Sequence, residues 1–127
     1  MGKQYNSQFT VFTDKEKVML ICMYSVKQGG WQAGLDKKAG IIRVQTPESL
    51  SNWSYGVNLS VQIIPSATSS QTTVSVTTEC RTKYGFLKGS GESKGEAEEV
   101  AKKFLIIAVA HLEKNAIKYE TPKEFVK

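Results

Sequence analysis

Residues 54–63 read SYGVNLSVQI, and along this stretch apolar and polar side chains alternate with a period of two. Successive side chains of a β-strand point to opposite faces of the sheet, so this alternation predicts a strand with one buried and one exposed face. Residues 73–81 repeat the pattern after a turn-rich connection at residues 65–70, which predicts a hairpin. Residues 41–45 alternate as well and add a third strand. The middle of the chain is therefore predicted to form an antiparallel meander.

The region before the meander is predicted to hold a short strand at residues 8–12 and then a helix. Thr13 and Glu16 have the spacing of a capping box, which marks the start of a helix. We expect this helix to end near residue 28, because two glycines follow, and a loop to lead from there to the meander. Residues 18–24 are apolar on every side. This pattern fits a helix that is covered on more than one side, and it also fits a buried strand, so both interpretations stay open.

A second and longer helix is predicted after the meander. Ser93 and Glu96 form another capping box, and the helical pattern continues over residues 94–117. One apolar stripe at helical spacing is expected to pack on the sheet: Val100, Phe104, Ile107, Ala108, His111 and Leu112. A narrower apolar line on the far side of the helix is of the kind that another element of the chain or a second subunit covers: Ile106, Ala110 and Ile117.

Together these elements follow the order β-α-β-β-β-α, which predicts an α+β two-layer sandwich. In this fold an antiparallel β-meander carries two helices packed on one face. A chain of 127 residues is long enough for one such domain with its own core. We expect a single domain at residues 1–118, followed by a flexible C-terminal tail at residues 119–127, whose sequence has no periodic pattern.

Three short motifs carry a resemblance to a known group of proteins. They are residues 40–43 (GIIR), residues 51–56 (SNWSYG) and the pair Tyr84 and Gly85. In these motifs the chain resembles small bacterial α+β domains of unknown function, some of which are found beside a short C-terminal oligomerisation motif called SHOCT. The resemblance covers residues 8–115, and the SHOCT motif itself is absent. It implies the fold and a bacterial or phage origin, and it implies no chemistry.

The composition is typical of a soluble globular domain, with 40% hydrophobic and 23% charged residues. The longest apolar runs have seven residues, whereas a membrane-spanning helix requires about 20. The first residues lack the apolar segment of a secretion signal, so we expect a cytoplasmic protein without a membrane partner. Cys22 and Cys80 are the only cysteines, and we expect both to be reduced thiols in the core.

No pattern in the sequence converges on catalysis, a metal or a cofactor. His111 is the only histidine and lies on the apolar stripe of the second predicted helix, so packing is the simpler interpretation and a general base or a metal ligand the alternative. The glycines at residues 85–95 precede that helix, yet their spacing does not match the common phosphate-binding motifs. We therefore expect no catalytic, cofactor-binding or metal-binding residues, and a protein that is not an enzyme.

A basic and aromatic cluster is predicted at one edge of the meander. The ends of the three strands that meet at this edge bring together Trp53, Lys83, Tyr84, Phe86 and Lys88. Aromatic rings can stack on bases while lysines contact phosphates, so this cluster is a candidate interaction site for weak nucleic-acid binding, which the net charge of +5 permits. The alternative is that these aromatic side chains close the end of the hydrophobic layer.

The polar face of the meander is unusual because it carries almost no charge. Its serine, threonine, asparagine and glutamine side chains contrast with the lysines and glutamates that are common on solvated sheets. This face is either a simple solvated face or one that a second copy of the chain or another protein covers. The candidate self-association residues are Ser60, Ser75, Ile106 and Ile117. The preferred function is therefore self-association or protein binding, and nucleic-acid binding is the alternative.

Overall fold

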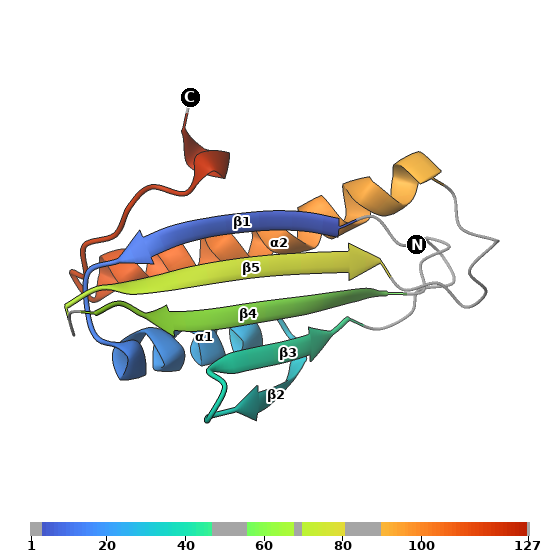
Figure 1. Cartoon of the computed structure of the whole chain (residues 1–127). Coiled ribbons are helices and arrows are strands. Elements are labelled where there is room, and N and C mark those ends of the chain that lie inside the picture. Colours follow the sequence, from blue (N-terminus) through green and yellow to red (C-terminus); the bar gives the residue numbers. More distant parts are fainter. Residues whose placement is uncertain (1–3, 47–55, 68–69, 81–89, 127) are drawn as a thin grey trace.

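The computed structural model describes residues 4–46, 56–67, 70–80 and 90–126 of the chain. Its elements, in sequence order, are β1 (Gln4–Val11), α1 (Lys15–Gln28), β2 (Gln32–Asp36), β3 (Ile41–Gln45), β4 (Val57–Pro65), β5 (Thr72–Cys80), α2 (Ser90–Lys114) and the short 3₁₀ helix η1 (Lys123–Phe125) (Figure 1).

The five strands form one antiparallel sheet in the order β1-β5-β4-β3-β2. Strands β2 to β5 make a meander, and β1 pairs with β5 at the far edge. Both helices lie behind the sheet in the view of Figure 1, so one face of the sheet is covered and the other is not. The α+β two-layer sandwich, with two helices on one face of an antiparallel meander, is confirmed.

Strand β2 lies in the segment for which a loop was predicted. Its residues pair with β3 so that Ala33 lies opposite Val44 and Leu35 opposite Ile42. The strand has only five residues, and the glycine between Ala33 and Leu35 weakens any alternating pattern, so no local signal identifies it. The pairing with β3 is what makes it a strand.

The turn between β2 and β3 requires a glycine at its end. Gly40 has a φ of 68°, and its amide nitrogen donates to the Asp36 carbonyl oxygen at 2.8 Å. A Cβ at this position would lie 2.8 Å from the carbonyl oxygen of Ile63 on β4. A side chain would therefore both strain the turn and push β4 away.

The first helix, α1, is confirmed, and the alternative of a buried strand is wrong. Its N-cap is Asp14 and not Thr13 as predicted, because the Asp14 carboxylate accepts from the Lys17 amide at 2.9 Å. The helix buries one side against the sheet and α2, and its most buried side chains are Val18, Met19, Ile21, Cys22, Ser25 and Val26. Its apolar residues on the opposite side remain exposed.

The second helix, α2, begins four residues earlier than predicted and ends three residues earlier. The predicted capping box at Ser93 therefore lies inside the helix. At the other end, Ala116 has a φ of 57°, and the Ile117 amide donates back to the Leu112 carbonyl oxygen at 2.9 Å, which turns the chain away from the helix axis.

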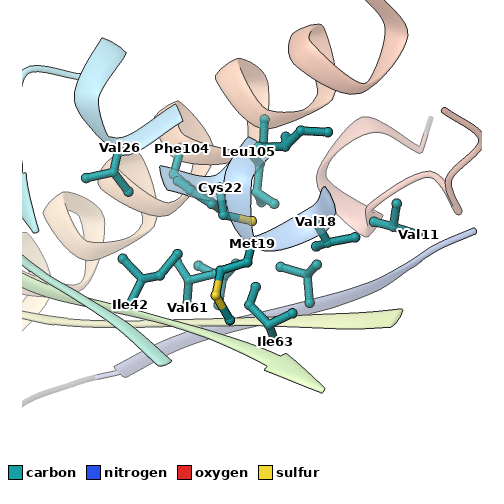
Figure 2. Close-up of a cluster of buried hydrophobic side chains, with 14 of the residues drawn as sticks. Val11, Val18, Met19, Cys22, Val26, Ile42, Val61, Ile63, Phe104 and Leu105 are labelled. Atoms are coloured by element: carbon teal, nitrogen blue, oxygen red, sulfur yellow. The ribbon is translucent and has the colours of Figure 1, made fainter. Parts of the chain in front are cut away.

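The buried side chains of α2 form the part of the core that lies on the helix side of the sheet. They are Ala97, Ala101, Phe104, Leu105, Ala108 and Leu112, whereas Val100, Ile107 and His111 are half-buried. Leu105 was missing from the predicted stripe. The side of α2 that is buried is wider than the stripe that the sequence pattern predicted. Figure 2 shows how the two helices and the sheet meet, with Phe104 and Leu105 near Cys22 and Val18 of α1, and Ile42, Val61 and Ile63 on the sheet side.

The segment after α2 runs along β1. Val11 and Tyr119 form an antiparallel bridge, and the Phe12 amide donates to the Lys118 carbonyl oxygen at 2.9 Å. Further along, the two carboxylate oxygens of Glu124 accept from the hydroxyls of Tyr5 and Ser7. The sequence predicted a flexible tail at residues 119–127, because it has no periodic pattern there. It gave no sign of these contacts, because they join residues more than 100 positions apart.

Candidate functional site

The uncovered side of the sheet is the most extended surface that the described residues form. On each strand the residues that point toward the helices are mostly buried, and the residues between them point the other way. We call this second set the outer sheet face. Its members are Gln4, Asn6, Gln8 and Thr10 of β1, Gln32, Gly34 and Asp36 of β2, Ile41, Arg43 and Gln45 of β3, Asn58, Ser60, Gln62 and Ile64 of β4, and Thr73, Ser75, Thr77 and Glu79 of β5.

The strand register arranges the outer sheet face in rows that cross the strands. One row contains Arg43, Ser60, Thr77 and Asn6, and the next contains Gln45, Asn58, Glu79 and Gln4. Within the first row, the Thr77 hydroxyl donates to the Asn6 side-chain oxygen at 2.9 Å. Amide and hydroxyl side chains can donate and accept hydrogen bonds, so this face can pair with a surface of the same kind.

The charged members of the outer sheet face are Asp36, Arg43 and Glu79. The Asp36 carboxylate accepts from the Ala39 amide at 3.1 Å, so it serves the β2–β3 turn. Arg43 on β3 and Glu79 on β5 lie on either side of β4, one row apart, with about 10 Å between their strands. Within the part of the chain that the structure describes, neither forms an ion pair, and the ion pair there joins Lys102 and Glu98 on α2 at 3.0 Å.

A hollow of about 720 Å³ opens beside β2 and β3, which form one end of the sheet. Trp31, Ala33 and Thr46 contribute to its wall, together with Gln32, Arg43 and Gln45 of the outer sheet face. None of these side chains is a carboxylate, an imidazole or a thiol. The hollow can therefore hold a polar or anionic group, but the lining side chains provide no general base.

The structure places the four predicted self-association residues on two different layers. Ser60 and Ser75 lie close together on the outer sheet face, on the neighbouring strands β4 and β5. Ile106 is 58% exposed on α2, on the helix layer. Ile117 lies beyond the end of α2, where it is half-buried and packs against the core. Ile106 and Ile117 therefore do not form one line on a helix, since the helix ends at Lys114.

The predicted basic and aromatic cluster, Trp53, Lys83, Tyr84, Phe86 and Lys88, lies outside the described residues. His111 does lie within them. Its Nε2 is 2.6 Å from the side-chain oxygen of Gln28, so it joins the ends of α1 and α2. Among residues 4–46, 56–67, 70–80 and 90–126, no three histidine, cysteine, aspartate or glutamate side chains gather as a metal site, and no helix is long and apolar enough to cross a membrane.

Sequence reasoning found the β4 and β5 part of the outer sheet face and missed the part from β1 and β2. In β1, Gln4, Asn6 and Gln8 alternate with Tyr5, Ser7 and Phe9, which is a usable signal. Ser7 interrupts the apolar phase, so the strand was predicted to begin only at residue 8. Ser7 is nevertheless buried, with 4% of its surface exposed, because its hydroxyl donates a hydrogen bond to the Glu124 carboxylate.

Comparison with known proteins adds little. No protein-family model matches the sequence, and no curated protein matches it. A solved structure that is similar to this chain is that of an uncharacterized protein from Bacillus thuringiensis. It has a TM-score of 0.39 and 10% sequence identity, and the match covers 81% of this chain and 96% of that chain.

Proposed function

We propose that this protein is a non-enzymatic domain that acts by self-association through the outer sheet face. The observation that carries the proposal is the chemistry of that face. Five strands present a layer in which amide and hydroxyl side chains predominate, and both helices lie on the other side of the sheet. A surface that stays in water is usually about one-quarter to one-third charged, which this layer is not.

The helix layer of the same molecule shows the usual composition. The exposed side of α2 carries Glu99, Lys102 and Lys103, and the half-buried Glu98 pairs with Lys102. Burying such charges is costly unless each one finds a partner, whereas amides and hydroxyls can be buried if they form hydrogen bonds. The outer sheet face is therefore the side of this molecule on which a second polar surface can be placed at the least desolvation cost.

The size of the face suits a modest interface. Strands lie about 4.8 Å apart and rise about 3.4 Å per residue. Three strands of eight or nine residues and two of five residues therefore give a face on the order of 600 Å². Two copies would then bury about 1,200 Å² in total, at the lower end of specific interfaces. We expect a dimer that dissociates at low concentration.

Arg43 and Glu79 favour one symmetric arrangement. If a two-fold axis runs along β4, the β3 strand of one copy lies over the β5 strand of the other. Arg43 then faces Thr77 of the partner subunit, and Glu79 of the partner subunit lies about 7 Å further along the strand, within reach of an arginine side chain. The same ion pair forms twice, once on each side of the axis.

The test is the solution mass, measured by light scattering and by sedimentation at tens of micromolar protein. We expect a dimer for the native chain and a monomer for Ser60→Lys, Arg43→Glu and Glu79→Arg. The double variant Arg43→Glu/Glu79→Arg should restore the dimer, because the ion pairs re-form with reversed signs. Ile106→Glu on the helix layer is the control and should leave the dimer intact.

A strictly monomeric native chain at these concentrations would contradict the proposal. A dimer that survives Ser60→Lys but is lost in Ile106→Glu would move the interface to the helix layer. If Ser60→Lys abolishes the dimer but each single charge reversal leaves it intact, the outer sheet face is the interface and the two-fold axis does not run along β4.

A further inference from the structure

The exposed side of α1 is apolar, which is uncommon for a helix side that faces water. Leu20 and Tyr24, one turn apart, are 57% and 58% exposed. A hollow of about 570 Å³ lies on one side of Leu20, between α1 and the β2–β3 turn, with Met19, Leu20, Met23 and Leu35 in its wall. Tyr24 lies on the other side of Leu20, where it lines a smaller hollow of about 270 Å³ toward α2. We call this hollow, together with the Leu20 and Tyr24 side chains, the α1 groove. Figure 1 shows that the β2–β3 turn and α1 lie at the same side of the molecule.

The apolar character of the α1 groove does not follow from the fold. Other residues of α1 already pack in the core, such as Val18 and Cys22, which are 1% and 2% exposed. Stability would therefore be served as well by lysine or glutamate at positions 20 and 24. A contiguous apolar surface that the core does not need is the usual sign of a binding site. Met19 belongs to the core and forms the floor of the groove, whereas Met23 is half-buried at its wall, and a methionine side chain adapts to differently shaped partners.

The charges around the groove are mostly positive. Lys15, Lys37 and Lys38 stand at its rim, opposed by Glu16 alone. Asp14 and Asp36 lie nearby and accept from the Lys17 and Ala39 amides, and they keep their negative charges. The excess of positive charge is therefore that of the rim itself, where none of the three lysines forms an ion pair with a described carboxylate. An occupant with apolar anchors and acidic flanks complements this groove in both respects.

We propose that the α1 groove binds an acidic amphipathic helix of another protein. Leu20 and Tyr24 are exposed and spaced four residues apart, and such a row forms a ridge that fits between the side chains of a second helix. The apolar side of the bound helix fills the hollow, and its acidic residues meet Lys15, Lys37 and Lys38. The groove belongs to the helix layer and the outer sheet face to the other layer, so this binding is independent of self-association.

The experiment is a selection of displayed random peptides of about 15 residues on the full-length protein, followed by affinity measurements on the enriched peptides. We expect enrichment of sequences with apolar residues at helical spacing and an excess of aspartate and glutamate. Leu20→Asp should weaken their binding roughly tenfold or more. Ile106→Asp is the matched control, because Ile106 is also helical and 58% exposed, and it should bind like the native chain.

The lysines are tested separately by the pair of changes Lys37→Glu and Lys38→Glu. At low salt the affinity of each variant for the peptides should be several-fold lower than that of the native chain. At high salt the difference should be smaller, because the salt screens the charges. The monomeric variant Ser60→Lys should bind the same peptides as the native chain, which separates this proposal from the previous one. Thermal unfolding of each variant checks that the fold is intact.

Three results would overturn the proposal. The first is that no peptide is enriched, and the second is that the enriched peptides bind Leu20→Asp and Ile106→Asp equally well. The third is that the native chain, but not Leu20→Asp, binds vesicles of phosphatidylcholine with phosphatidylserine while no peptide is enriched. In that case the groove is a site for an anionic membrane surface and not for a helix.

Discussion

On β4, Val57, Leu59 and Val61 are fully buried under the helices, whereas Asn58, Ser60 and Gln62 between them point outward and remain accessible. The two faces of the sheet are thus made by the same strands and have opposite roles. The covered face contains the contiguous core of the described residues, and the outer sheet face contributes little to it. Because stability comes from one side, substitutions on the other side are free to serve association.

The largest effect is expected from truncating the covered face. Leu59→Ala and Phe104→Ala each remove a side chain that is 0% exposed, and each should lower the free energy of unfolding by roughly 2 to 5 kcal/mol. Ser60→Ala, next to Leu59 on the same strand, should change it by less than about 0.5 kcal/mol. Urea denaturation of the three variants measures the difference. Equal losses for Leu59→Ala and Ser60→Ala would contradict the division of roles between the faces.

A smaller effect is expected where the C-terminal segment completes the covered face. Glu124→Ala removes the acceptor of the Ser7 hydroxyl, which is then buried without a partner, and of the Tyr5 hydroxyl. We expect a loss of about 1 to 3 kcal/mol in unfolding free energy. Glu120→Ala is the control in the same segment, because its side chain is exposed and only its backbone bonds to β1. A loss that is the same for both variants would mean that Glu124 contributes nothing through its hydrogen bonds.

The smallest effect is a pH dependence at the end of β1. Burial raises the pKa of Tyr5 above its usual value, and the hydrogen bond to Glu124 and the nearby charges of Glu124 and Glu98 add to the rise. The folded state therefore favours the neutral phenol, so its stabilisation is present below pH 10 and is lost as the pH rises above the pKa of the unfolded chain. Tyr119, whose hydrogen bond to Glu113 raises its pKa, adds a second contribution of the same sign.

Thermal unfolding between pH 8 and pH 11 measures this dependence. Tyr5→Phe should make the loss of stability at high pH less steep than in the native chain. Tyr24→Phe serves as the control, because Tyr24 is 58% exposed on α1. If both variants follow the native curve, ionisation of Tyr5 is not coupled to unfolding.

The covered face also explains the state of the cysteines. Cys22 and Cys80 are buried and are not joined in a disulfide, which confirms the prediction that both lie in the core. Burial raises the pKa of Cys22 to about 12, so its reactive thiolate form is scarce in the folded protein. Neither position contributes to the outer sheet face or to the α1 groove.

The sequence by itself determined the elements whose side chains repeat at a regular period. Strands β3, β4 and β5, helix α1 and most of helix α2 were predictable because burial of one face leaves a local pattern of period 2 or 3.6. The polar face that contains Ser60 and Ser75 was predictable for the same reason. The glycines after α1 and the glycine at position 40 marked the positions where the chain changes direction.

The tertiary structure alone decided which of these patterns meet. Strand β2 exists through its pairing with β3, and the C-terminal segment is held by Glu124 contacts to Tyr5 and Ser7 across almost the whole chain. The position of Arg43 and Glu79 on either side of β4, and the hollow beside Met19, Met23 and Leu35, also depend on pairing and packing between distant segments. Such contacts leave no period in the local sequence, because each partner is selected by the fold and not by its neighbours along the chain.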